Sequence, residues 1–113
     1  MQVLFKPRHP QAIDLREMTE RRVRFVLRRL GQTIPRAEIQ MSDVNGPRGG
    51  ADKRCQVALH TDGLRPVVVS SAAGDWRTAL DDALARAARF LLRLRRRSTD
   101  SRRLRQRPIQ YEL

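Results

Sequence analysis

Several residue types are scarce in this 113-residue chain, which has one cysteine and, as its aromatic residues, three phenylalanines, one tryptophan and one tyrosine. A single cysteine excludes an internal disulfide and a zinc cage made of cysteines. No run of about 18 apolar residues is present, and the first residues lack the pattern of a signal peptide. We therefore expect a cytoplasmic protein with no metal, no cofactor, no small-molecule substrate and no membrane partner.

Acidic residues are also few, because 12 Asp and Glu residues stand against 24 Lys and Arg residues, for a net charge of +12. Only Lys6 and Lys53 are lysines, so almost all of the positive charge is on arginine. A guanidinium group binds phosphate through two parallel hydrogen bonds and also stacks on bases. A domain of this charge attracts polyanions, so nucleic acid is the expected partner.

Hydrophobic periodicity predicts a single domain with the element order strand, helix, three strands, helix. Residues 2–6 suit the first strand. Asp14 and Glu17 match the capping box of a first helix, and Gly31 is placed to end that helix in a left-handed C-cap. The positions of this helix that should face the core are Leu15, Thr19, Val23, Val26 and Leu30.

Alternation of apolar and polar residues predicts three further strands, paired as consecutive antiparallel neighbours. Residues 45–50, NGPRGG, fit a hairpin connection between the first two of them better than a nucleotide-binding loop. The third strand is expected at residues 67–71. The inward positions should be Ala37, Ile39, Met41, Cys55, Val57 and Leu59. The opposite face should be exposed to water and carry Glu38, Gln40, Arg54, Gln56 and His60.

The second helix has the clearest apolar stripe, and Asp75 is its expected N-cap. The stripe consists of Trp76, Leu80, Ala83, Ala87, Leu91 and Leu94. Beyond Arg97 the periodicity is lost, so we expect a folded domain over residues 1–97 and a flexible basic tail over residues 98–113. Because each helix has one apolar face, both should pack on one side of a four-stranded sheet, as an α+β two-layer sandwich. No apolar helix face is then left over, which predicts a monomer.

A flank of arginines beside this stripe is the main candidate binding site. It consists of Arg86, Arg89, Arg93 and Arg96, at steps of three, four and three, with Arg97 extending it. Residues 86–107 contain ten arginines and one acid, Asp100, which is more positive charge than solubility requires. We interpret the flank as a phosphate-binding surface. The arginines of the first helix fit RNA binding and simple solubility equally well, because Glu17 and Glu20 can pair with them.

Catalysis has little support in the sequence. Cys55 and His60 lie five positions apart in one strand, so alternation places them on opposite faces, where they cannot act as nucleophile and base. The adjacent Asp81 and Asp82 diverge by about 100° around their helix, so they cannot share a proton or a metal. We therefore expect a binding protein and not an enzyme.

These elements and residues together resemble the short form of the ribosome hibernation promoting factors, also called ribosome-associated inhibitors or ribosomal subunit interface proteins. The resemblance covers residues 2–97. It depends on the opening QVLF, on the helix start Leu15-Arg16-Glu17, on SDVNGPRGGADKRC at residues 42–55, and on DWRTALDDALARAARFLLRL at residues 75–94.

The resemblance implies a β-α-β-β-β-α domain that binds the small ribosomal subunit and its rRNA between head and body, blocking the mRNA and tRNA sites without catalysis. By position, the family's RNA-binding residues correspond to Arg16, Arg22, Arg28, Arg86, Arg89, Arg93 and Arg97. The long form of the family has a second domain that pairs two ribosomes. The 113 residues of this chain do not include it, so we do not expect this chain to pair ribosomes by that route.

Two other classes of function stay open at the level of sequence. One is a general structured-RNA-binding protein or RNA chaperone, which would bind unrelated duplexes as tightly as the ribosomal subunit. The other is a protein-interaction module that would use the polar sheet face, with Gln40, Gln56 and His60 as its exposed residues.

Overall fold

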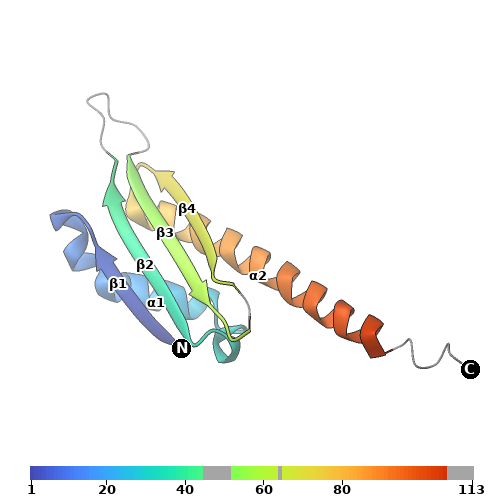
Figure 1. Cartoon of the computed structure of the whole chain (residues 1–113). Helices are drawn as coiled ribbons and strands as arrows, with labels where there is room; N and C mark the ends of the chain where they lie inside the picture. The colour runs from blue at the N-terminus through green and yellow to red at the C-terminus, as the bar shows by residue number, and fades with distance from the viewer. Residues whose placement is uncertain (45–51, 64, 107–113) are drawn as a thin grey trace, which may run out of the picture.

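A computed structural model describes residues 1–44, 52–63 and 65–106 (Figure 1). Side chains are described as far as residue 97. Its strands are β1 (Gln2–Pro7), β2 (Arg36–Asp43), β3 (Lys53–His60) and β4 (Val67–Ala73). Its α-helices are α1 (Arg16–Val26) and α2 (Trp76–Gln106), and two short 3₁₀ helices are η1 (Pro10–Leu15) and η2 (Gly31–Thr33). The predicted loop at residues 45–50 lies outside the described residues.

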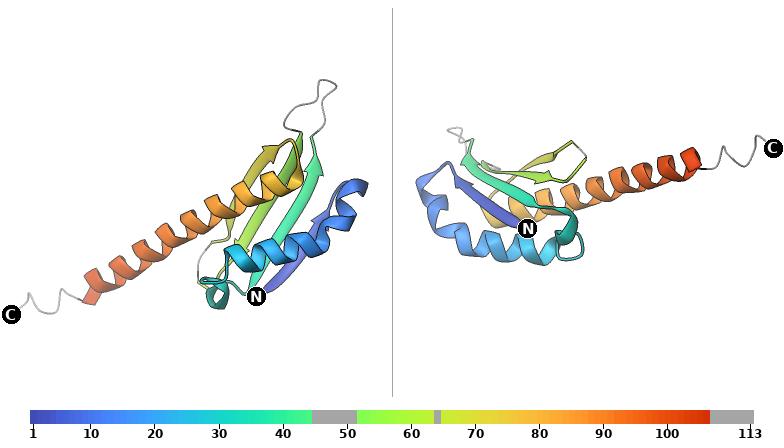
Figure 2. Two further views of the ribbon diagram at one scale, coloured as in Figure 1. Left: turned by 180° about the vertical axis from the view of Figure 1, so that it is seen from behind. Right: turned by 60° about the horizontal axis from the view of Figure 1, so that its bottom comes forward.

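The strands form one four-stranded sheet in the order β1-β2-β3-β4. β1 is parallel to β2, and the pairs β2–β3 and β3–β4 are antiparallel. Both helices lie on the same side of this sheet (Figure 2). The parallel pairing follows from the crossover through α1, since parallel neighbours need a long connection. The predicted α+β two-layer sandwich and its three consecutive antiparallel strands are confirmed.

The core lies between the sheet and the helices. Fully buried residues alternate along β2 and β3 as predicted, and they are Ala37, Ile39, Met41, Cys55, Val57 and Leu59. The stripe of α2 is buried from Trp76 to Leu91, and Leu94 is half-buried. The periods of two and 3.6 residues therefore identified the inward faces correctly. They missed Leu84, which is fully buried beside the stripe.

The first helix differs from the prediction at both ends. Residues before Arg16 form η1, which begins after His9, where the ring Nδ1 accepts a hydrogen bond of 3.1 Å from the Gln11 amide. α1 then ends at Val26 instead of running to Gly31, so the capping box at Asp14 and the C-cap at Gly31 are both wrong. Among the described residues, the left-handed region is occupied by Gly63 alone, at φ 77°.

The apolar spacing of this region continues past the end of α1. Leu27, Leu30 and Ile34 are buried at steps of three and four, whereas Val26 is only half-buried. The backbone nevertheless changes to tighter turns, because the Leu30 amide donates to the Leu27 carbonyl at 2.9 Å and the Ile34 amide donates to the Gly31 carbonyl at 3.3 Å. The apolar period therefore did not locate the end of the α-helix.

α2 continues to Gln106, nine positions past the predicted helix end at Arg97. Residues 98–106 contain neither proline nor glycine, and arginine is a good helix former, so an established helix can propagate without an apolar stripe. The expected helix end at Arg97 is therefore wrong, whereas the flexibility of the basic tail over residues 98–113 stays a prediction. The remainder of that tail, residues 107–113, lies outside the described residues.

Asp75 caps α2 as predicted. Its Oδ1 accepts a hydrogen bond of 2.7 Å from the Thr78 amide, and its Oδ2 accepts one of 3.1 Å from the Thr78 hydroxyl. These bonds favour the ionised form, so they hold the pKa of the Asp75 carboxyl below its usual value.

A carboxyl whose pKa is lowered by folding stabilises the protein at pH values above its unfolded pKa of about 3.9, and that contribution is lost as the pH falls through the folded pKa. Asp75→Asn retains a capping oxygen but does not titrate. We expect the advantage of the wild type in melting temperature to shrink as the pH is lowered from 7 toward 3. Thermal melts across that range test this, and curves that remain parallel would contradict it.

Candidate nucleic-acid interface

Arg86, at the N-terminal end of the arginine flank of α2, contacts the edge strand β4. Arg86 Nη1 lies 3.3 Å from the Ser70 carbonyl oxygen and 3.4 Å from Asp82 Oδ2. Asp82 Oδ2 also accepts a hydrogen bond of 2.5 Å from the Ser71 hydroxyl. That bond, aided by Arg86 and Arg89, lowers the pKa of the Asp82 carboxyl, so the carboxylate stays charged and orients Arg86.

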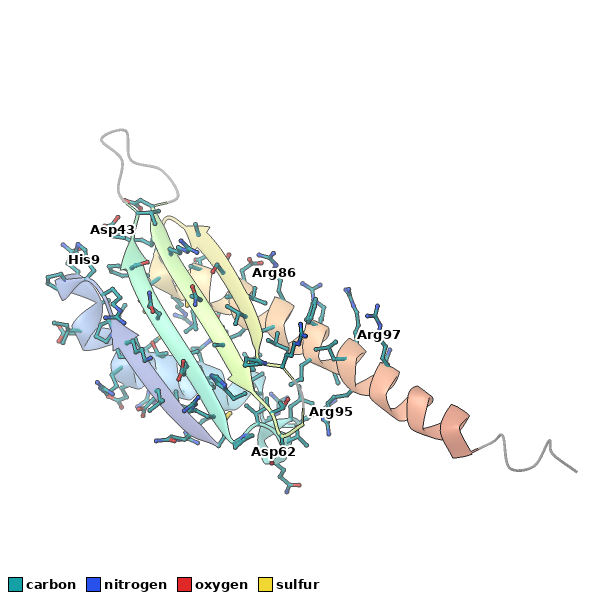
Figure 3. The ribbon with its side chains drawn as sticks, viewed as in Figure 1. His9, Asp43, Asp62, Arg86, Arg95 and Arg97 are labelled. Carbon is teal, nitrogen blue, oxygen red and sulfur yellow. The ribbon has the colours of Figure 1, made fainter. Side chains whose placement is uncertain are left out.

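Toward its C-terminal end the flank has no acidic partner among the side chains that the structure describes, which extend to residue 97. Within that part of the chain, neither an ion pair nor a hydrogen bond involves the side chains of Arg93, Arg96 or Arg97, and all three residues are exposed. Figure 3 shows Arg86 and Arg97 pointing to one side of α2 and Arg95 to the other. Unpaired guanidinium groups keep their full capacity to bind phosphate.

The same flank borders a hollow of about 290 Å³ between α2 and β4. Its lining residues are Val69, Arg86, Arg89, Phe90 and Arg93. The exposed fraction of Phe90 is 49%, which is high for a phenylalanine. Sequence reasoning missed Phe90, although its position off the apolar stripe and directly after Arg89 was a usable signal.

The predicted arginines of the first helix have more intramolecular contacts. The Arg16 guanidinium lies 5.5 Å from the centre of the Phe5 ring. Arg28 stacks at 4.5 Å over the Phe25 ring and donates a hydrogen bond of 2.8 Å to the Phe25 carbonyl. Both guanidinium groups are held in place, and both residues remain exposed to a partner.

Arg22 joins the two helices, because its Nε donates a hydrogen bond of 2.9 Å to Asp81 Oδ1 on α2. Asp81 and Phe90 are nine residues apart and therefore lie on opposite sides of that helix. The structure thus separates Arg22 from the flank, and it does not collect all the predicted arginines on one surface.

We expect Arg22→Met to lower the free energy of unfolding by up to about 1 kcal/mol, because its ion pair is about one-third exposed. We expect Arg22→Met to weaken RNA binding only as much as the loss of any single positive charge would. Arg21→Met is the matched control, since Arg21 pairs with Glu17 on the exposed face of α1. Urea unfolding and RNA titration measure the two effects. Equal stability of the two variants would argue against a structural role for Arg22.

The outer face of the sheet is polar, as predicted. Glu38 is its centre, with carboxylate oxygens 3.8 Å from Lys6 Nζ, 3.4 Å from Arg36 Nε and 3.7 Å from His60 Nε2. Another polar cluster lies at the end of the sheet that His9 and Asp43 mark in Figure 3. There the Lys53 ammonium lies 2.7 Å from Asp43 Oδ2.

The geometry of Cys55 and His60 does not suit nucleophilic catalysis. Cys55 is fully buried, and burial raises the pKa of its thiol to about 12. A thiol with this pKa stays protonated at neutral pH and is a poor nucleophile. His60 pairs with Glu38 on the opposite face of the sheet. The prediction that the two side chains face apart is confirmed.

No helix in the described part of the chain is long and apolar enough to cross a membrane. No protein-family model matches this sequence. A search of curated protein sequences likewise finds no match.

The three-dimensional structure does resemble solved structures. A ribosomal subunit interface protein from Coxiella burnetii superposes with a TM-score of 0.67 at 14% identity, over 84% of this chain and 98% of that one. The N-terminal domain of Protein Y from Thermus thermophilus superposes with a TM-score of 0.58 at 20% identity, over 80% of this chain and 99% of that domain. The chain therefore has the fold that these two proteins share.

Proposed function

We propose that this protein is a ribosome hibernation factor that binds the small ribosomal subunit and inhibits translation by occupying the mRNA and tRNA sites of the decoding region. It acts by occupancy, in the cytoplasm, with rRNA as its main contact and without catalysis. It is a monomer when it is not bound to the ribosome.

The observation that carries this proposal is the arginine flank of α2 on this particular fold. One neighbour in fold is a ribosomal subunit interface protein. In the present chain an exposed face of α2 carries Arg93, Arg96 and Arg97, which have no acidic partner among the described side chains. Arg89 and Arg93 are the central contacts of the proposed interface. Arg86, Arg96 and Arg97 extend it along α2. Arg16 of α1 and Arg28, which follows the end of α1, add contacts.

Co-sedimentation of the purified protein with small subunits, large subunits and whole ribosomes, over a series of salt concentrations, tests the proposal. We expect retention on small subunits and whole ribosomes at near-physiological salt, and none on large subunits. Equal binding to all three that is lost together as salt rises would contradict it, because counterion release alone produces that result.

A general structured-RNA-binding protein is the other outcome of this experiment. Such a protein would bind an unrelated RNA duplex as tightly as it binds the small subunit at the same salt concentration. A competition assay with a duplex of matched phosphate number therefore separates the two functions.

A further inference from the structure

The hollow between α2 and β4 combines cationic and apolar side chains. Neither phosphate binding nor solubility requires both together. Three of its five lining residues are arginines, and the other two, Val69 and Phe90, are apolar. A site for phosphate alone needs the cations and not the ring. An unpaired nucleotide needs both, since its base has an apolar face and its backbone is anionic.

The ring of Phe90 is also available, unlike that of the other half-exposed phenylalanine. Phe25 is 59% exposed, but the Arg28 guanidinium already covers its ring at 4.5 Å. Within the described residues, no guanidinium, ammonium or other ring stacks on Phe90. An apolar ring exposed between arginines is therefore ready to accept a planar group.

The arginines on either side of Phe90 have a spacing that suits a nucleotide. Arg86 and Arg93 are seven residues apart, or about 10 Å along the helix axis. Arg86 is fixed by Asp82 and the Ser70 carbonyl, whereas Arg93 is exposed and unpaired within the described residues. A base stacked on the Phe90 ring would lie between the guanidinium groups of Arg86 and Arg93. Each of these groups could then reach one of the phosphates that flank the base.

From this geometry we infer that the Phe90 hollow binds one unpaired nucleotide of RNA, by stacking its base on the Phe90 ring and pairing its phosphates with Arg86, Arg89 and Arg93. The inference rests on the proposed function and refines it, because it makes an unpaired RNA segment the ligand of the α2 flank. Stacking accepts any base, so the site has little sequence preference.

Phe90→Leu tests this without changing the charge, and Phe90→Tyr restores a ring. The probe is an RNA octamer of adenosines with a central 2-aminopurine, and the comparison is a blunt RNA duplex with the same number of phosphates. We expect Phe90→Leu to weaken binding of the octamer about tenfold and to abolish the change in 2-aminopurine fluorescence that accompanies binding, because the base no longer moves from its neighbouring adenines onto a ring. Phe90→Tyr should behave as the wild type.

Duplex affinity and the dependence of affinity on salt should not change in Phe90→Leu, because no cation is lost. Leu92→Ala is the control for a general effect of apolar truncation, since Leu92 is 41% exposed on the same helix and does not line the hollow. A Phe90→Leu variant that binds the octamer and changes its fluorescence like the wild type would overturn the inference.

Co-sedimentation of the same variants with small subunits distinguishes this failure from a failure of the proposed function. If the wild type binds small subunits and Phe90→Leu leaves the octamer unaffected, the stacking site is refuted and the proposed function stands. If the wild type is not retained on small subunits but the octamer responds to Phe90→Leu, the stacking site stands and the ribosomal role is refuted.

Discussion

Charge reversal of Arg89 and Arg93 together is expected to weaken binding to small ribosomal subunits by about 100-fold or more. A hydrogen bond to a charged group contributes about 1.5–3 kcal/mol, and each reversal also puts a repulsive carboxylate beside phosphate. The double variant Arg89→Glu/Arg93→Glu should bind measurably only at low salt. Filter binding or co-sedimentation at several salt concentrations measures the loss.

The control for this prediction has the same change of charge on the other helix. Arg21→Glu/Arg24→Glu alters the exposed face of α1, outside the predicted site, and removes one ion pair to Glu17 and one hydrogen bond to the Met1 carbonyl. If both double variants lose affinity equally while their thermal melts stay cooperative, net charge and not the flank determines binding. If only the α2 variant loses affinity, the flank is the site.

Leu84→Ala is expected to lower the free energy of unfolding by about 2–5 kcal/mol, which is a large part of the stability of a small domain. Leu84 is fully buried in the core cluster, so truncation removes apolar contacts and leaves a cavity that the surrounding strands and helices fill only in part. Urea unfolding followed by circular dichroism measures the change.

Leu92→Ala is the matched control, because the substitution is identical and lies eight positions along the same helix. Leu92 is 41% exposed, so its truncation should cost less than about 1 kcal/mol. Similar losses in the two variants would mean that α2 packs on the sheet with a different face. Ribosome binding by Leu84→Ala should be compared at a temperature where the variant is folded.

The alternation of apolar and polar residues in the strands and the apolar stripe of the second helix correctly predicted which face of each element is buried. Ile39 and Val57 are fully buried on the inward face of the sheet, and Leu80 and Leu91 are fully buried on α2. Such faces are determined by the local period, because a shift of one residue in a strand would expose every apolar side chain. The end of the first helix was less predictable, because Leu27, Leu30 and Ile34 continue the apolar spacing after α1 has ended at Val26.

The end of α2 was misjudged for the opposite reason. No core side chain is required to continue a helix that has already formed, so the loss of periodicity after Arg97 did not mark the helix end. The concentration of positive charge in the sequence was enough to select the arginines of α2 as candidate site residues. The structural role of Arg22 could not be predicted in this way, because its partner Asp81 is 59 positions away in the sequence.

The sequence by itself determined the charge, its concentration on arginine, the order of the elements and the inward face of each, because these follow from composition and local period. The tertiary structure decided which arginines are free and which are engaged, since an ion pair such as Arg22–Asp81 depends on how the helices cross. It also brought Phe90 of α2 and Val69 of the edge strand β4 to the lining of one hollow. No local pattern contains that arrangement, because it exists only when α2 packs beside β4.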